Sequence, residues 1–434
     1  MTSVLLDPPK LNAPIICKLD NGLTIIAEQM PVEAVNLNIW YNIGSAVEAD
    51  AINGMAHFLE HMMFKGTPQL SAGEFERAIE ERGAVTNAAT SQEYTHYYIT
   101  TAPKDFAALA PLQFEVVTNP QIADMAFERE RLVVLEEIRR SDDNPSRRTF
   151  QRAMETCFNC LPYRRPVLGP PEAIAQFTPQ QMRSFHAQWY RPQTMTATVV
   201  GNLPVDELIE IVATAHAEAE EHRHQSRPPI VSPPQFEPEP AFTEVVRREY
   251  TDSRLQQARL ILLWRVPGMV DLADTYALDM LAAVLGQGKM SRLFRDLRED
   301  RKLVTAIGAS NVTKGVQGMF YIGAQLPSEN VADVEAAIAQ HLECFRTELV
   351  AEIDLARIRT KTANRFVFGN ERPSDRANLY GYYYSQMQDL EPALTYTQRL
   401  QAVTAEDVRI AARRYLTPDA FAMVVVHPDK SRQN

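Results

Sequence analysis

One short segment of the sequence has residues that could bind a metal ion and activate water. It reads His57-Phe-Leu-Glu60-His61, so the two histidines are four positions apart and lie on one face of a helix. Two imidazoles one turn apart can bind one zinc ion, and Glu60 can accept a proton from a water molecule beside the metal. The order His-x-x-Glu-His is a known zinc signature, the reverse of the commoner one. We predict a hydrolytic zinc site with Glu60 as the base.

The residues around this motif predict a buried helix. The segment 53–64 is apolar on nearly every side, and Asn53 is a suitable N-cap residue. Histidines and a glutamate inside such a helix need polar partners, because unsatisfied buried polar groups are costly. A metal ion would be one such partner. The alternative is a structural core helix whose histidines bond to backbone carbonyls.

A third metal ligand must come from elsewhere, because a catalytic zinc ion usually has three protein ligands and one water. The segment 127–139 offers four candidates, namely Glu128, Glu130, Glu136 and Glu137. Glu130 and Glu137 are seven positions apart and share a helical face. We expect the apolar Leu132 and Val133 to lie around them, so a carboxylate that points inward needs a metal ion or a cation as its partner. The alternative for Glu128, Glu130 and Glu136 is surface charge paired with neighbouring arginines, and we favour it for Glu136.

These residues and several other segments resemble the pitrilysin-like peptidase family M16, which includes mitochondrial processing peptidase subunits and short bacterial peptidases. The resemblance covers nearly the whole chain and includes residues 19–24, 54–67, 87–91, 97–98, 130–138, 162–169, 200–202 and 285–294. It implies that Glu137 is the third zinc ligand, with one Zn²⁺ per chain. It also implies that Glu130 is the supporting glutamate of the catalytic site.

The resemblance further implies a zinc-dependent endopeptidase that cleaves unfolded peptides or presequences. The substrate would bind as an added strand at the edge that carries Asn87, Ala88 and Ala89, and such pairing reads backbone rather than side chains. The family encloses its substrate in a chamber made from four α/β units. This chain supplies two, so a second subunit is expected.

One part of the family pattern is missing. Members with a complete site carry an arginine and a tyrosine seven positions apart in the second half, where this chain has Phe320 and Pro327. Arg376 and Tyr383 have the spacing but occur in a helical segment further along the chain. We therefore expect a heterodimer in which a homologous chain without the zinc motif supplies both groups, with a homodimer as the alternative.

Two other functions stay open. The family also contains core subunits of respiratory complexes that keep the fold without hydrolysis, so a non-catalytic scaffold is one alternative. A peptide-binding subunit that holds zinc without turnover is another. The intact set of His57, Glu60, His61, Glu130 and Glu137 favours the peptidase, because a scaffold does not need buried acids beside buried histidines.

A proline-rich segment divides the chain into two halves. Six prolines between residues 222 and 242 exclude a helix or a central strand there. We therefore expect a zinc-bearing domain over residues 1–225, a linker over 226–242 and a related domain without metal over 243–434.

The two halves share a pattern that indicates duplication. Near the end of each, an N-capping threonine (Thr178 or Thr404) precedes a helix, a tyrosine with a proline turn, and an apolar strand. Strand-like and helical runs cluster rather than alternate strictly, which is typical of the α+β class. We expect two related α/β-sandwich units, with strands at 23–27, 35–41, 258–266 and 319–324 and helices at 73–82 and 275–285.

Composition excludes several classes of protein. The net charge of −11 argues against a nucleic-acid binder and against a basic protein of membrane surfaces. No stretch approaches the roughly 18 consecutive apolar residues of a membrane span, and four cysteines in a chain of this length do not form a disulfide framework. The first residues do not have the pattern of a secretory or transit leader, so we expect none. We expect a bacterial cytoplasmic protein, with the matrix of an organelle as the alternative.

Overall fold

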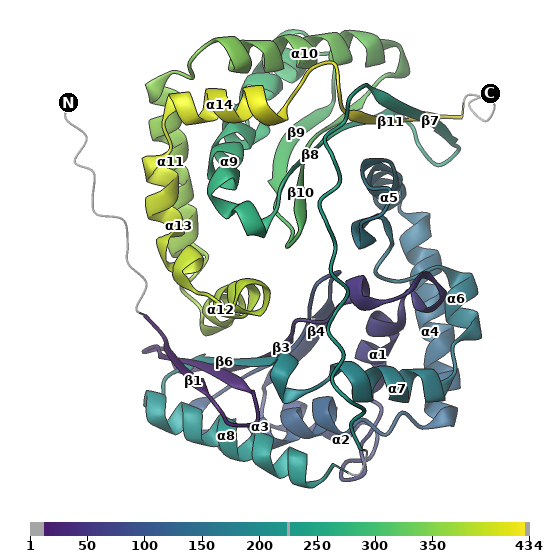
Figure 1. The fold of residues 1–434 in the computed structure, drawn as a ribbon, viewed down its shortest axis with the longest axis vertical. Helices are drawn as coiled ribbons and strands as arrows, with labels where there is room; N and C mark the ends of the chain where they lie inside the picture. Colours follow the sequence, from purple (N-terminus) through teal and green to yellow (C-terminus); the bar gives the residue numbers. More distant parts are fainter. Residues whose placement is uncertain (1–12, 224–225, 430–434) are drawn as a thin grey trace.

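The computed structural model describes residues 13–223 and 226–429 and contains two mixed β-sheets with helices packed on them (Figure 1). The first sheet has the order β1-β2-β6-β3-β5-β4. Its strands are β1 Ile15–Lys18, β2 Thr24–Gln29, β3 Val35–Tyr41, β4 Val85–Thr90, β5 Thr95–Thr101 and β6 Met195–Gly201. Its half also contains α1 Met55–Met63, α2 Glu74–Glu81, α3 Pro103–Thr118, α4 Asp124–Asp143, α5 Pro145–Cys157, α6 Pro171–Gln176, α7 Pro179–Trp189 and α8 Val205–Glu221.

The second sheet has the order β7-β11-β8-β10-β9. Its strands are β7 Val246–Asp252, β8 Ala258–Pro267, β9 Ala306–Val312, β10 Gln317–Leu326 and β11 Ala422–Pro428. The helices of this half are α9 Leu272–Gly286, α10 Val331–Thr347, α11 Glu352–Phe368, α12 Pro373–Met387, α13 Glu391–Ala402 and α14 Ala405–Tyr415. The strands and helices predicted from sequence all occur close to their expected bounds, and the α+β class is confirmed.

The topology repeats, as the sequence pattern predicted. In each half the last strand in sequence pairs in parallel with an early strand of the same half: β6 pairs with β2, and β11 pairs with β7. The order β2-β6-β3-β5-β4 then corresponds strand by strand to β7-β11-β8-β10-β9. The helices α7 and α14, which precede the parallel strands, both begin with a threonine capping box. The predicted duplication is therefore confirmed in the fold.

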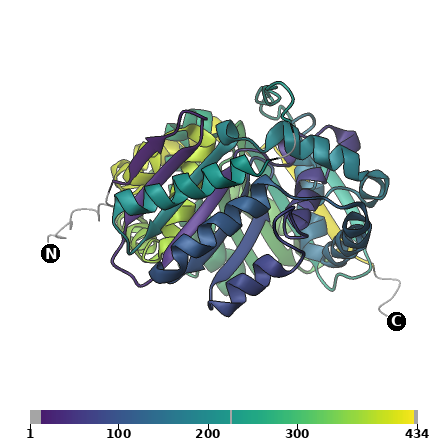
Figure 2. The same ribbon diagram turned by 90° about the horizontal axis from the view of Figure 1, so that it is seen from below.

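One helix of each half packs on the β-sheet of the other half. Helix α12 of the second half packs on β3 and β6 of the first sheet, and α5 of the first half packs on β8 and β11 of the second (Figure 1). Seen from below, α8 and α3 lie over the other face of the first sheet (Figure 2). The α12 contact is close, since a Cβ at Gly381 would lie 2.0 Å from Trp40 Nε1. Each sheet is therefore covered partly by helices of its own half and partly by a helix of the other half.

The proline-rich segment forms no helix or strand among its described residues, as predicted, and runs between the two halves (Figure 1). One residue fixes it firmly. The Glu239 carboxylate accepts hydrogen bonds from the backbone N–H groups of Asn159, Cys160 and Leu161, and it pairs with Arg265 Nη2 at 2.7 Å.

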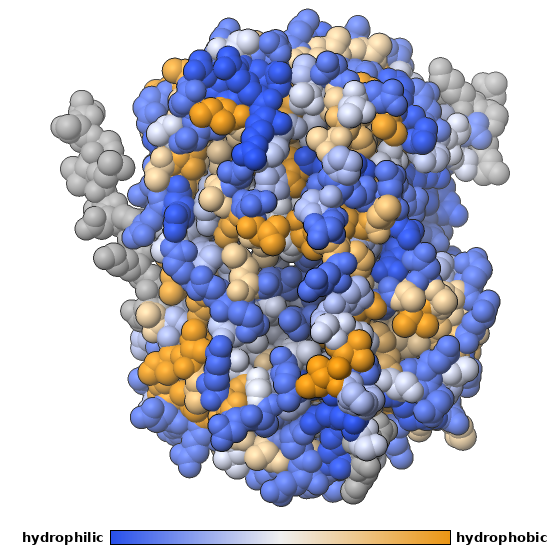
Figure 3. Space-filling model, in the orientation of Figure 1, coloured by the Kyte–Doolittle hydropathy of each residue, from blue (hydrophilic) through white to orange (hydrophobic). Residues whose placement is uncertain are grey.

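The face shown in Figure 3 is mainly hydrophilic. On the face shown in Figure 3, apolar residues form small separate patches among polar ones. Within residues 13–223 and 226–429, no helix combines the length and apolar character that a membrane crossing requires.

Candidate metal centre

Helix α1, which carries the His-x-x-Glu-His motif, begins differently from the prediction. Asn53 is not the N-cap, because Gly54 precedes the helix with φ 101° and no side chain caps it there. Instead, the buried Glu48 carboxylate accepts hydrogen bonds from the backbone N–H groups of Gly54 (2.8 Å) and Ala56 (2.7 Å). Asn53 Nδ2 donates to the same carboxylate at 2.9 Å. A carboxylate from outside the helix therefore satisfies the first N–H groups.

Helices α1 and α4 bring the three predicted ligands together. His57 Nε2 lies 3.5 Å and His61 Nε2 lies 3.4 Å from the same Glu137 oxygen, Oε2. A tetrahedral zinc ion with bonds of about 2.0–2.1 Å keeps its ligand atoms about 3.3–3.4 Å apart. The donor set of two imidazoles and one carboxylate, all within 4.8 Å of one another, therefore fits a zinc ion.

The electrostatics of this cluster favour a cation between the ligands. Burial and the neighbouring His61 lower the pKa of His57 to about 4, so its imidazole is neutral and able to bind metal. Burial also acts to lower the pKa of His61, but its hydrogen bonds to Glu130 and Glu137 raise that pKa to about 9. The two carboxylates thus stabilise a positive charge on the protonated His61 ring. A metal ion bound to the ring would replace a proton and bring the positive charge in its place.

Glu130 orients one ligand rather than joining the cluster. Its Oε1 lies 2.9 Å from His61 Nδ1, and its Oε2 lies 2.8 Å from Lys65 Nζ. A carboxylate on Nδ1 fixes the ring so that Nε2 faces the metal position. Glu130, predicted as catalytic, is therefore placed as a positioning residue, and its partner Lys65 was missed by the sequence analysis.

Glu60 is held beside the cluster by a residue that was not predicted. The Thr90 hydroxyl donates to Glu60 Oε2 at 2.5 Å. Burial raises the pKa of Glu60, and the hydrogen bond from Thr90 opposes that rise. Thr90 is the last residue of β4, inside the run that the sequence analysis noted only for its backbone edge.

The predicted substrate edge is free on one side. Strand β4 ends the first sheet and pairs only with β5 in the described chain. The side chains of Asn87 and Ala89 are exposed, and Ala88 packs against the core. The outer backbone edge of β4 can therefore accept another strand, and the same strand carries Thr90.

Two residues of α4 do not lie where they were predicted. Leu132 and Val133 were expected around the inward glutamates, but their side chains are 67% and 51% exposed. The buried face of the helix is set by Phe127, Glu130, Val134 and Ile138 instead. The surface pairing favoured for Glu136 is confirmed, because it bonds to Arg139 and Arg140. The same alternative, left open for Glu128, also holds, since Glu128 bonds to Arg131.

The second half supplies no arginine and tyrosine at the expected strand. Phe320, on β10, is fully buried in the second core. Arg376 is committed elsewhere, because its Nη1 lies 2.8 Å from Glu28 Oε1 on β2, at the contact between the halves. Neither position provides a free cation for substrate.

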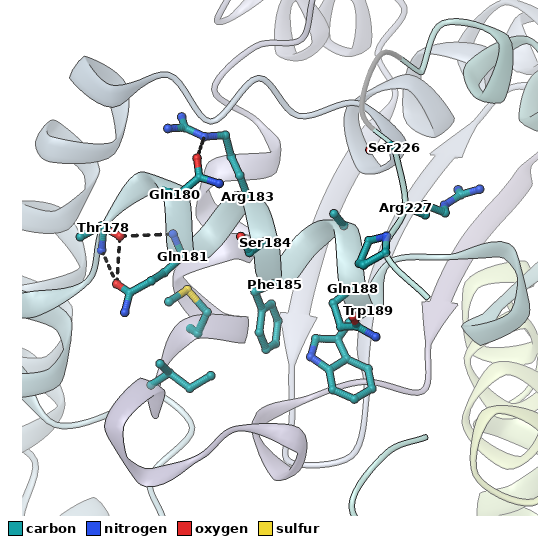
Figure 4. Close-up of a pocket in the computed structure, with 14 residues that line it drawn as sticks. Thr178, Gln180, Gln181, Arg183, Ser184, Phe185, Gln188, Trp189, Ser226 and Arg227 are labelled. Carbon is teal, nitrogen blue, oxygen red and sulfur yellow. Dashed lines mark hydrogen bonds between the residues drawn. The ribbon is translucent and has the colours of Figure 1, made fainter. Parts of the chain in front are cut away.

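A large pocket of about 1020 Å³ lies apart from this chemistry, between α7 and residues 226–228 of the linker (Figure 4). The close-up shows the Thr178 capping box, with Gln181 bonded back to it, at one end of the pocket. The lining does not include any predicted ligand or base. Pocket size therefore does not identify the site in this molecule.

Comparison with protein families gives two matches that together cover most of the chain. Residues 23–171 match the family model described as insulinase (peptidase family M16). Residues 176–362 match the one described as the peptidase M16 inactive domain. The first match contains all three candidate ligands and Glu60.

Known proteins of similar length resemble the chain throughout. An uncharacterized zinc protease of Mycobacterium tuberculosis is 29% identical over 99% of this chain and 96% of its own. The crystal structure of a protease from Helicobacter pylori superposes with a TM-score of 0.87 at 25% identity, covering 96% of this chain and 99% of that one. An M16-like peptidase structure from Alicyclobacillus acidocaldarius has a TM-score of 0.84 at 20% identity, covering 97% and 100%, and so shares the fold.

Proposed function

The chain belongs to peptidase family M16, and from that premise we propose that it is a zinc-dependent endopeptidase that cleaves unfolded peptides or presequences in a chamber formed with a second subunit. One observation carries the proposal. His57 Nε2 and His61 Nε2 each lie at the spacing of zinc ligands from a single Glu137 oxygen, at 3.5 and 3.4 Å, and the Glu60 carboxylate accepts a hydrogen bond from Thr90.

The residues around the cluster have separate tasks in this proposal. His57, His61 and Glu137 would hold a zinc ion, which would supply a Lewis acid for the scissile carbonyl and lower the pKa of water near it. Glu60 accepts that proton and returns it to the amine that leaves. Its raised pKa suits a group that must both take and give a proton. Substrate backbone pairs with the free edge of β4, so peptides of varied sequence can bind.

Metal removal tests this function directly. We expect the purified protein to contain one zinc ion per chain and to cleave a quenched peptide library in its active assembly. A chelator should remove zinc and cleavage together, and added zinc should restore both. Cleavage that persists without metal would refute the proposal. Bound zinc with no hydrolysis in any assembly would instead support a peptide-binding subunit.

We also propose that the second subunit is a homologous chain without the zinc motif. The proposal rests on Phe320, which occupies the expected arginine position in a buried core, and on Arg376, which is bound to Glu28. The protein is assayed alone and after co-expression with such a homologue. Cleavage that requires the homologue supports the heterodimer, and full activity of the isolated chain as a homodimer would overturn it.

Thr90 should position the catalytic base. Thr90→Val keeps the side-chain shape and removes the hydroxyl that donates to Glu60. Hydrogen bonds to charged groups contribute about 1.5–3 kcal/mol, so we expect kcat to fall about tenfold or more with little change in KM. Thr90→Ser, which keeps the hydroxyl, should restore kcat.

The matched control is Thr86→Val, at a threonine on the same face of β4, where we expect kcat to stay near the unmodified value. If Thr90→Ser were as impaired as Thr90→Val, or if KM rose in place of the loss in kcat, the hydroxyl would not be what positions Glu60.

A further inference from the structure

A groove of about 730 Å³ lies along the part of α4 that follows the candidate metal ligand Glu137 in the sequence. It lies between the C-terminal end of α4, helix α5 and residues 166–171. Its lining includes Ile138, the next residue after Glu137, and, one turn further along the helix, Ser141 and Asp142. Helix α5 lies beside α4 and forms the opposite side (Figure 1).

The groove is within reach of residues that flank the scissile bond. Four residues of helix, from Glu137 to Ser141, span about 6 Å. An extended peptide advances about 3.3 Å per residue, so a side chain about two residues from the metal can enter the groove. The partly exposed Phe150, which packs edge-on against Tyr321, adds an aromatic wall.

Two arginines of the groove form no ion pair with a carboxylate within the described chain, although Glu137 interacts electrostatically with Arg147, and Asp252 with Arg152, at longer range. Arg147 is exposed, and its Nη1 donates to Ser141 Oγ at 3.3 Å. Arg152 has its guanidinium 4.4 Å from the Tyr250 ring, and its buried Nη1 has no hydrogen-bond acceptor in residues 13–223 and 226–429. Arg148, by contrast, is neutralised by Asp252 at 2.5 Å.

The acidic residues of the groove do not neutralise these arginines. Asp142 and Glu155 line it as well, and Glu155 accepts a hydrogen bond from Gln151 at 2.9 Å. Among the described residues, neither carboxylate is within ion-pair distance of Arg147 or Arg152. Two guanidinium groups thus remain able to bind an added carboxylate, in a chain whose net charge is −11.

We propose that this groove is a substrate subsite that binds an aspartate or glutamate side chain about two residues from the scissile bond, through Arg147 and Arg152. A planar guanidinium can bind a carboxylate with two parallel hydrogen bonds, which gives both strength and orientation. Backbone pairing along β4 admits many sequences. The groove adds a preference for unfolded peptides with an acidic residue over presequences, which are rich in arginine and poor in acidic residues. This inference rests on the proposed peptidase function.

The test compares peptides that differ only in one residue, glutamate, glutamine or lysine, placed at each of three positions on either side of the cleaved bond. For the unmodified assembly we expect kcat/KM to be about tenfold higher with glutamate than with lysine at one position. Arg147→Glu should reverse the order at that position. Arg140→Glu, a matched charge reversal on the exposed side of α4 where Arg140 pairs with Glu136, should leave the ratio unchanged.

A binding measurement separates this inference from the proposed function. The Glu60→Gln protein is titrated with the same labelled peptides, and fluorescence anisotropy reports affinity without any need for turnover. Tighter binding of the glutamate peptide that is lost with an added Arg147→Glu supports the subsite even if no assembly hydrolyses peptide. Zinc-dependent cleavage with equal rates for the three peptides, or an acidic preference that survives Arg147→Glu, would overturn the subsite and leave the peptidase standing.

Discussion

Glu60→Gln is expected to lower kcat/KM for peptide cleavage by about 10³-fold or more while one zinc ion stays bound to each chain. Proton transfer by a positioned side chain contributes about 10²–10⁴-fold to a reaction rate, and glutamine cannot accept the proton. The substitution keeps the shape of the side chain, and its amide oxygen can still accept the hydrogen bond from Thr90. The three ligand side chains are unchanged, so metal analysis should show no loss of zinc.

The matched control is Glu136→Gln. Glu136 precedes the ligand Glu137 in sequence, but it lies on the exposed face of α4 and pairs with Arg139 and Arg140. We expect its kcat/KM to match that of the unmodified protein. A Glu60→Gln protein that kept more than about a tenth of the activity would show that another group accepts the proton. If it lost zinc, the drop in activity would say nothing about the base.

The chemistry at the centre was the most predictable part of the molecule, because its residues are constrained by short spacings. His57 and His61 share a face in any helix, so the motif defines half of the site before folding. The seven-residue spacing from Glu130 to Glu137 restricts both to one side of α4. The resemblance was needed to choose Glu137 as ligand and Glu130 as its support, since spacing alone cannot distinguish the two.

Contacts between distant segments could not be predicted in the same way. Asn53 has a good N-cap side chain, but Glu48, six residues before Gly54, bonds to the N–H groups of Gly54 and Ala56 instead. Thr90 meets Glu60 only because β4 ends beside α1. The sequence of one segment indicates only the local structure that it favours. Which side chain from another segment bonds to it depends on tertiary packing.

The exposed face of α4 shows how an apolar pattern can mislead. Leu132 and Val133 interrupt a charged helix and look like core residues in sequence, yet the buried stripe follows Phe127, Glu130, Val134 and Ile138. Glu130 enters that stripe because His61 and Lys65 satisfy its oxygens. A paired carboxylate can thus occupy a buried position that hydrophobicity alone would assign to leucine.

The packing of α5 and α12 on the sheets of the opposite halves likewise could not be predicted from the sequence. Both helices were assigned to the half in which they occur in the chain, but each packs on the opposite sheet. The buried pair of Arg376 and Glu28 holds one of these exchanged helices, which makes the pair a test of how strongly the halves depend on each other.

Arg376→Met is expected to destabilise the protein by about 3–5 kcal/mol, because breaking a buried ion pair leaves an uncompensated charge. The Glu28 and Arg376 side chains are 5% and 11% exposed, and Arg376 Nη1 lies 2.8 Å from Glu28 Oε1. Tyr380 also donates to Glu28, at 2.8 Å, but a phenol cannot neutralise a carboxylate. Thermal unfolding at a fixed scan rate should show a fall in Tm of about 3–6 °C.

The double variant Glu28→Gln with Arg376→Met distinguishes the buried charge from lost packing. A glutamine can still accept the hydrogen bond from Tyr380 and leaves no charge behind, so more than half of the lost Tm should return. Arg399→Met, which breaks a pair with Glu391 on the exposed side of α13, should change stability by less than about 1 kcal/mol. If Arg376→Met cost no more than that control, α12 would be held on the first sheet by the packing of Trp40 against Gly381 and its apolar neighbours alone. If the double variant were no more stable than Arg376→Met, the loss of stability would come from the missing arginine side chain and not from the unpaired charge of Glu28.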